Sequence, residues 1–118
     1  MGTLNIEIEI GDSEGTRFEP VSALVDTGAS YTTVPSPLLR RLDVAVHSQV
    51  TFVLADGRTI QRDIGQTWIR IDGHSIITIV VFGDERSESL LGAYTLQGLL
   101  LSVDTPNERL VPVPGLLM

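Results

Sequence analysis

The sequence of 118 residues predicts an all-β protein, a small closed β-barrel with one or two short helices. Apolar and polar residues alternate over residues 4–10, which is typical of a strand with one buried face. Two Asp-Gly pairs, Asp56-Gly57 and Asp72-Gly73, separate β-rich runs and predict tight hairpin turns. Many short strands joined by tight turns are typical of a small barrel.

Each expected strand is a run rich in β-branched or aromatic residues that ends at turn residues such as Gly, Pro, Asn or Asp. Ser36 suits the N-cap and Pro37 the first position of a short helix over residues 37–42. A second short helix is expected over residues 91–96, with Gly98 as its C-terminal stop. The expected strands cover residues 4–10, 17–25, 31–34, 50–54, 59–64, 68–71, 75–82, 99–103 and 109–113.

The composition excludes several classes of function. Hydrophobic residues make up 42% of the chain, enough for one folded domain over residues 1–118. The net charge is −7 and the longest basic cluster is Arg40-Arg41, so no nucleic-acid partner is expected. The chain has no cysteine, and His47 and His74 lack ligand-like spacing, so no metal and no cofactor are expected.

The N-terminus has neither the basic nor the apolar region of a signal peptide. The longest apolar run, residues 76–82, is far shorter than the ~20 residues of a membrane-spanning helix. We therefore expect a cytoplasmic protein with no membrane partner.

One stretch carries the residues that point to chemistry. Leu24 and Val25 lead directly into Asp26, Thr27 and Gly28, which predicts a carboxylate held in a tight turn at the end of a strand. Glycine gives such a turn conformational freedom and lets another group approach the backbone closely. Threonine can both donate and accept hydrogen bonds. An ordinary strand-to-turn transition uses the same residue types, so the context decides between the two interpretations.

Residues 24–30 resemble the active-site loop of the aspartic proteases, whose pattern is apolar-apolar-Asp-Thr/Ser-Gly-Ala/Ser. A single copy in a chain of this length is similar to the retroviral-type, or retropepsin-like, members, which act as two-fold dimers. The stretch Leu90-Leu91-Gly92 resembles the apolar-apolar-Gly motif that packs against this loop in the family. The resemblance covers most of the chain and implies the β-barrel of that family, a homodimer and a polypeptide substrate.

The resemblance also implies roles for individual residues. Asp26 is the catalytic carboxylate, Thr27 bonds across to the loop of the second subunit, and Gly28 lets the substrate backbone lie close. The hairpin about residues 55–58 stands where the family has its flap, the hairpin that covers bound substrate. The residues implied to contact substrate are Ala29, Ser30, Ala55, Asp56, Gly57 and Arg58, and those implied to support the loop are Leu90, Leu91 and Gly92.

The chemistry explains why a single motif implies two chains. Hydrolysis of a peptide bond without a metal or a nucleophilic side chain needs one group that takes a proton from water and another that gives one to the substrate. Two neighbouring carboxylates that share one proton do both, as the aspartic proteases illustrate. A two-fold dimer brings Asp26 against its own copy through an isologous interface.

Two other interpretations stay open. The chain could keep the retropepsin-like fold without catalysis and act as a dimeric module that binds proteins or peptides, because a fold does not imply a function. Retroviral enzymes usually pair an Asp and an Arg at the positions held here by Ser30 and Ala93, and that ion pair supports their dimer. The second interpretation is a structural β-barrel in which Asp-Thr-Gly occurs by chance and Asp26 is exposed and replaceable.

Overall fold

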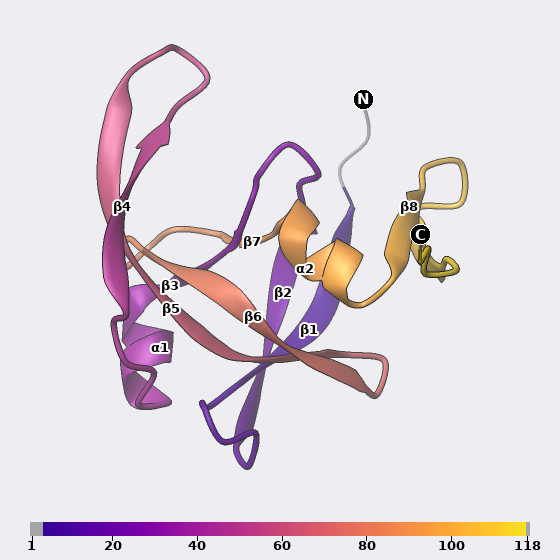
Figure 1. Ribbon diagram of the computed structural model, residues 1–118, viewed down its shortest axis with the longest axis horizontal. Helices are drawn as coiled ribbons and strands as arrows, with labels where there is room; N and C mark the ends of the chain where they lie inside the picture. Colours follow the sequence, from indigo (N-terminus) through magenta and orange to yellow (C-terminus); the bar gives the residue numbers. More distant parts are fainter. Residues whose placement is uncertain (1–3, 118) are drawn as a thin grey trace.

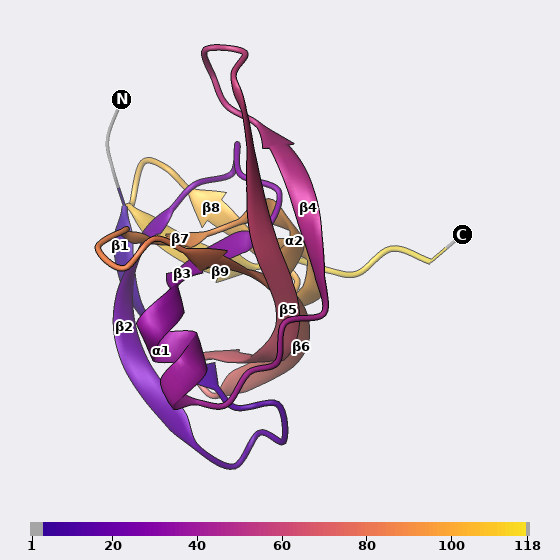
Figure 2. The same cartoon turned by 90° about the vertical axis from the view of Figure 1, so that its left-hand side faces the viewer.

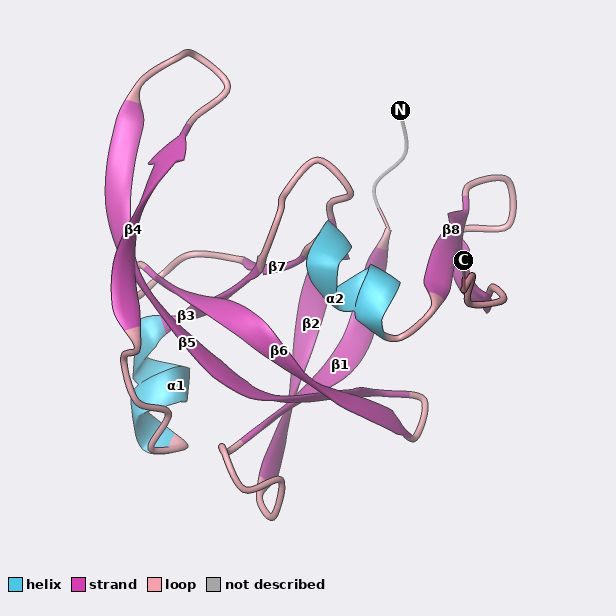
Figure 3. Ribbon diagram, viewed as in Figure 1, coloured by secondary structure: helices cyan, strands magenta, loops and turns pink. Residues whose placement is uncertain are grey.

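The computed structural model describes residues 4–117, which form nine strands and two short helices (Figures 1 and 3). The expected domain spans residues 1–118, of which residues 1–3 and 118 lie outside the described part. The strands are β1 (Asn5–Gly11), β2 (Phe18–Val25), β3 (Thr32–Pro35), β4 (Ser48–Val53), β5 (Thr59–Ile71), β6 (His74–Gly83), β7 (Ser89–Leu91), β8 (Leu101–Asp104) and β9 (Arg109–Pro112). The helices are α1 (Ser36–Arg41) and α2 (Ala93–Gly98).

Six strands close into a barrel in the order β1-β2-β7-β3-β6-β5, and β5 then pairs back with β1. The closing contacts are the antiparallel pairs Glu9 with Arg70 and Ile10 with Ile69. Figure 2 looks into this ring from one side. Strand β4 pairs only with the far end of β5, and the two form a hairpin that stands clear of the ring. The prediction of a small closed β-barrel with two short helices is confirmed.

The interior of the barrel is apolar. In β1, Ile8 and Ile10 are buried and Glu7 is exposed, so the alternation in the sequence correctly predicted the buried face. Helix α1 adds Leu38 and Leu39 to the same core. The largest fully buried apolar side chains are Ile8, Ile10, Leu39, Leu42, Ile69 and Leu91.

The expected break within residues 59–71 is absent, because β5 runs without interruption from Thr59 to Ile71. Gly65, in the middle of this strand, is buried and pairs with Val80, and a Cβ there would lie 2.5 Å from the carbonyl oxygen of Ala45, so the glycine lets the preceding segment pass close to β5. A single strand therefore links the barrel to the projecting hairpin.

The two helix ends differ in detail from the sequence prediction. Helix α1 begins at Ser36, with Pro35 at the N-cap and Pro37 one position later than expected. The prediction of Ser36 as N-cap is wrong because its hydroxyl donates instead to the carbonyl oxygen of Gly83. Thus the hydroxyl of Ser36 bonds to β6, which is distant in sequence, and does not cap the helix.

Helix α2 does end at Gly98, but not through a left-handed glycine. The residue with positive φ is Leu100, at 56°, and the C-cap is Leu99. A Cβ at Gly98 would lie 2.6 Å from Cδ1 of Ile76 in β6. Glycine at this position therefore serves the close packing of α2 on the sheet.

Strands β8 and β9 form a separate two-stranded sheet that follows α2 (Figure 1). Strand β8 begins at Leu101 rather than at residue 99, since the left-handed Leu100 precedes it. No helix within residues 4–117 has the length and apolar character needed to cross a membrane.

We predict that Leu39→Ala lowers the free energy of unfolding by about 2–5 kcal/mol, because it leaves a cavity in the core. Leu39 is 0% exposed, whereas Leu116, the control position for the same substitution, is 87% exposed. Urea denaturation followed by Trp68 fluorescence measures both variants. Equal stability of the Leu39→Ala and Leu116→Ala proteins would contradict this description of the core.

Candidate active site

The loop that carries Asp26 owes its position to an inserted strand. Strand β7 lies between β2 and β3, pairing parallel with β2, where Val25 meets Leu91, and antiparallel with β3, where Thr33 meets Leu90. The chain leaving β2 must therefore pass around the end of β7 before it enters β3. Residues 26–31 make this passage and present Asp26 at the end of the sheet.

Backbone hydrogen bonds fasten the loop to the segment that follows β7. The N–H of Asp26 donates to the carbonyl oxygen of Leu91 at 3.0 Å. On the far side of the loop, the N–H of Ala93 donates to Ala29 at 2.8 Å and that of Tyr94 donates to Ser30 at 2.9 Å. Both ends of the loop are thus bonded to residues 91–94.

Gly92 lies where the two segments come closest. A Cβ at this position would lie 2.5 Å from the carbonyl carbon and oxygen of Tyr31 and 3.0 Å from the nitrogen of Thr32. These are backbone atoms, so the neighbouring chain would have to move to admit any side chain. The structure thus brings the Leu90-Leu91-Gly92 stretch directly against the Asp26 loop.

A buried cluster of threonine hydroxyls, which no sequence motif predicted, lies beneath the loop. The Oγ1 atoms of Thr32 and Thr95 are 2.7 Å apart, and those of Thr78 and Thr95 are 3.0 Å apart. The hydroxyl of Thr32 also accepts the N–H of Gly92 at 3.1 Å. The one signal in the sequence was Thr78, which interrupts the apolar run over residues 76–82. Because these buried groups are hydrogen-bonded, the cluster links the start of β3, directly after the loop, to α2 and β6.

Asp26 is half-buried, and Thr27 and Gly28 are exposed. Oδ1 of Asp26 accepts the N–H of Gly28 at 3.0 Å. Gly28 is absent from the residues with positive φ, so the expectation that it supplies an unusual backbone conformation is wrong. A Cβ there would contact only Oδ1 of Asp26, at 3.3 Å, so the outer side of Gly28 stays open for another group.

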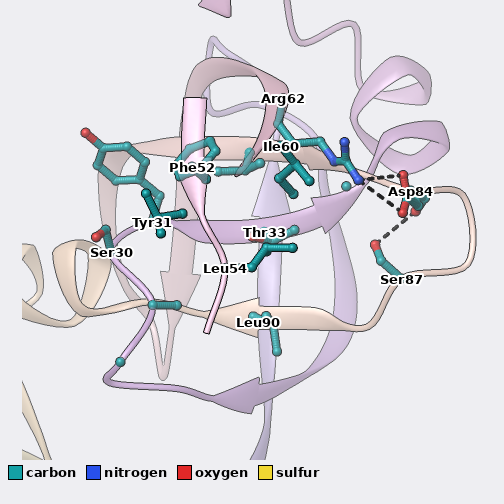
Figure 4. Close-up of a pocket in the computed structure, with 15 residues that line it drawn as sticks. Ser30, Tyr31, Thr33, Phe52, Leu54, Ile60, Arg62, Asp84, Ser87 and Leu90 are labelled. Atoms are coloured by element: carbon teal, nitrogen blue, oxygen red, sulfur yellow. Dashed lines mark hydrogen bonds and ion pairs between the residues drawn. The ribbon is translucent and has the colours of Figure 1, made fainter. Parts of the chain in front are cut away.

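A cavity of about 360 Å³ lies beside the loop, between it and the β4–β5 hairpin (Figure 4). Gly28, Ala29 and Ser30 line it, and Asp26 itself does not. The rest of the wall comes from Tyr31, Thr33, Phe52, Val53, Leu54, Ile60, Arg62, Val81, Gly83, Asp84, Ser87 and Leu90.

The expected hairpin-tip residues Ala55, Asp56, Gly57 and Arg58 are all exposed, and none of them lines this cavity. The tip is longer than the expected two-residue turn. The strand pairing ends at Val53 with Thr59, and the N–H of Leu54 donates to Arg58 at 2.7 Å. Gly57 has a φ of 87°, which explains the glycine there.

The strands of the hairpin, rather than its tip, reach the cavity. Phe52 and Leu54 share one face of β4 and its continuation, and Ile60 and Arg62 share one face of β5. Their period-two spacing was readable in the sequence and could have identified them. Tyr31 joins this hairpin to the loop through an edge-to-face contact with Phe52, with ring centroids 6.1 Å apart, and it makes a similar contact with Tyr94 at 5.9 Å.

Within residues 4–117, no three His, Asp or Glu side chains lie close enough together to hold a metal ion.

Comparison with known families decides the identity of the fold. Residues 16–98 match the family model described as "gag-polyprotein putative aspartyl protease". This chain belongs to that aspartyl protease family. The matched segment includes the Asp26 loop, the β4–β5 hairpin and the Leu90-Leu91-Gly92 stretch.

The aspartyl protease fold also matches solved structures. One is the solution structure of the Simian Foamy Virus (mac) protease, with a TM-score of 0.57 and 22% sequence identity over 79% of this chain and 91% of that one. At this identity the likeness shows a shared fold. A comparison with curated proteins gives no match. The resemblance to retroviral-type aspartic proteases seen in the sequence is confirmed.

We predict that Gly92→Ala destabilises the protein by about 1–3 kcal/mol, because the new methyl group meets backbone atoms that cannot turn aside. Gly115→Ala is the control, since a Cβ at Gly115 makes only ordinary contacts with Leu100, at 3.4 Å and beyond. Thermal unfolding monitored by circular dichroism compares the two variants. A Gly92→Ala protein as stable as Gly115→Ala would show that the close contact with Tyr31 is not required.

Proposed function

We propose that the protein is an aspartic endopeptidase whose active form is a homodimer, with one Asp26 contributed by each subunit. The observation that carries the proposal is a single Asp-Thr-Gly loop fastened to the barrel of an aspartyl protease family member. The loop presents a half-buried carboxylate next to two exposed residues, Thr27 and Gly28. One chain alone provides half of a carboxylate pair.

In the proposed dimer, Asp26 and Asp26 of the partner subunit share one proton. The ionised carboxylate takes a proton from a water molecule, and the water oxygen attacks the carbonyl carbon of the peptide bond. The protonated carboxyl group gives its proton to the carbonyl oxygen. The resulting tetrahedral species then collapses, a proton passes to the amide nitrogen, and the C–N bond breaks to give a carboxylic acid and an amine.

Other residues are proposed to assist. The hydroxyl of Thr27 bonds to the partner loop and fixes the two loops relative to each other. Ala29 and Ser30, which line the cavity, contact the substrate, and the hairpin about residues 55–58 closes over it and excludes water. Leu90, Leu91 and Gly92 support the loop from behind.

The C-terminal sheet is proposed to take part in the dimer. Strands β8 and β9 pair only with each other within residues 4–117, so their outer edges keep unpaired backbone groups. A two-stranded sheet is of marginal stability by itself. Pairing of residues 109–113 with the second subunit would satisfy these groups.

A second candidate function is a dimeric binding module without catalysis. Ser30 and Ala93 favour it, since the ion pair that usually supports the retroviral dimer is absent here. No charge is left unpaired by the loss, because both partners are missing together. Cleavage of an unstructured protein that depends on Asp26 and is blocked by a pepstatin-like inhibitor distinguishes the enzyme from the module.

We predict that Asp26→Asn lowers the rate of hydrolysis about a hundredfold or more, because an amide cannot act as a general base. The fold should be retained, since the amide keeps the shape of the carboxylate. Asp72→Asn is the control, because Asp72 lies in the exposed turn between β5 and β6. The rate is measured on an unstructured protein substrate. Cleavage by the Asp26→Asn protein at the unaltered rate would exclude a catalytic role for Asp26.

We predict that sedimentation equilibrium at micromolar concentration detects a dimer in exchange with the monomer. A pepstatin-like inhibitor should shift the equilibrium towards the dimer, because it binds only the paired loops. A strictly monomeric protein that retains full peptidase activity would contradict the proposed assembly.

A further inference from the structure

The cavity beside the Asp26 loop has one charged end. Apolar side chains form most of its wall, among them Phe52, Leu54, Ile60, Val81 and Leu90. At the end away from the loop, two charged residues line it, Arg62 from β5 and Asp84 from the loop after β6. Figure 4 shows the pair at this end, with Ser30 and Tyr31 at the opposite side.

These two residues form an ion pair. Nη2 of Arg62 lies 3.2 Å from Oδ1 and 3.3 Å from Oδ2 of Asp84, and Nη1 donates to the carbonyl oxygen of Gln61 at 3.0 Å. The side chain of Arg62 is 31% exposed and that of Asp84 is 76% exposed. The guanidinium of a partly covered arginine side chain is therefore paired with a carboxylate at the rim of the apolar cavity.

Both partners are held by the surrounding chain. Arg62 lies opposite Val50 within the β4–β5 pairing, on the same face of β5 as Ile60. The loop that begins at Asp84 folds back on itself, because the N–H and the hydroxyl of Ser87 both donate to the carbonyl oxygen of Asp84, at 3.1 and 2.9 Å. Gly83 permits this turn, since a Cβ there would lie 2.5 Å from Oγ of Ser87.

We propose that the Arg62–Asp84 ion pair sets the charge preference of this cavity, so that the intact pair selects an uncharged side chain of a bound peptide. The inference rests on the proposed function, which supplies the peptide as the occupant. A charged side chain that enters the cavity loses its hydration and finds both protein charges already paired. An uncharged side chain loses little favourable hydration and gains contact with the apolar wall.

Removal of one residue of the ion pair should shift the preference towards a peptide side chain whose charge is opposite to that of the residue that remains. Without Arg62, the carboxylate of Asp84 stays at the end of the cavity and attracts a basic side chain. Without Asp84, the guanidinium of Arg62 attracts an acidic one, because an unpaired charge at the end of the cavity attracts a side chain of opposite charge. Loss of both should remove the discrimination between acidic and basic side chains.

The test measures binding apart from cleavage. All variants are made in the Asp26→Asn protein and titrated against short fluorescein-labelled peptides that share one uncharged sequence and carry Met, Glu or Lys at one position at a time. Fluorescence anisotropy gives the affinities. The proteins compared carry Arg62→Gln, Asp84→Asn, both substitutions or neither.

The Arg17–Asp43 ion pair provides the matched control. Its N–O distance is also 3.2 Å and it joins the same residue types, but neither residue lines the cavity. Arg17→Gln and Asp43→Asn therefore make the same changes in net charge as the test variants, and the peptide preference should stay unchanged.

At one peptide position, the starting protein should favour Met over both Glu and Lys. Arg62→Gln should raise the ratio of Lys to Glu affinity, and Asp84→Asn should lower it, each by about two- to fivefold, the range expected of a partly exposed charge pair. The double variant should give a ratio near that of the starting protein.

Two results would overturn the inference: affinities that change by one common factor for all peptides, as expected of a purely structural ion pair, or no binding of any peptide. Cleavage of the same peptides by the protein with Asp26 intact is measured separately. If the Lys to Glu affinity ratio shifts in opposite directions in the two single variants, as predicted, but no peptide is ever cleaved, the result would contradict the proposed function and leave the specificity inference standing.

Discussion

The contact between the Asp26 loop and residues 91–94 is the constraint on which the site depends. Backbone hydrogen bonds hold both ends of the loop, and they can form because Gly92 has no side chain to separate the two segments. The insertion of β7 between β2 and β3 brings those segments together and helps to close the barrel. The position of Asp26 is therefore a consequence of the topology, and the buried threonine hydroxyls beneath the loop reinforce it.

A second consequence of the topology is the position of the cavity. Because β5 runs unbroken through Gly65, one strand carries Ile69 in the barrel core and Ile60 and Arg62 at the cavity. The hairpin is thus an extension of the barrel wall, and its strands rather than its tip face the loop. The aromatic contact between Tyr31 and Phe52 connects the two sides. A peptide bound beside Asp26 would contact groups that the same sheet holds in place.

The sequence predicted the structural features that depend on a local pattern of residues. Alternation identified the buried face of β1, and Asp72-Gly73 identified a turn in which both residues have positive φ, at 49° and 82°. The sequence did not predict features that depend on a contact with a residue distant in the chain. The hydroxyl of Ser36 bonds to Gly83 instead of capping a helix, and the pairing of Arg62 with Asp84 depends on the fold bringing β5 next to the loop after β6. The motif predicted the importance of Gly92, but only the structure shows which backbone atoms require it.

In the proposed dimer, two copies of Asp26 form one reaction centre, and an experiment that mixes subunits distinguishes this arrangement from catalysis by single chains. Unaltered and Asp26→Asn proteins are mixed at constant total concentration, allowed to exchange, and assayed for cleavage of one peptide. If each site needs both carboxylates, activity follows the square of the unaltered fraction and falls to about a quarter in an equal mixture, since a two-fold dimer assembles its subunits at random. A linear decline, with about half of the activity left in that mixture, would contradict the claim, because each chain would then act alone.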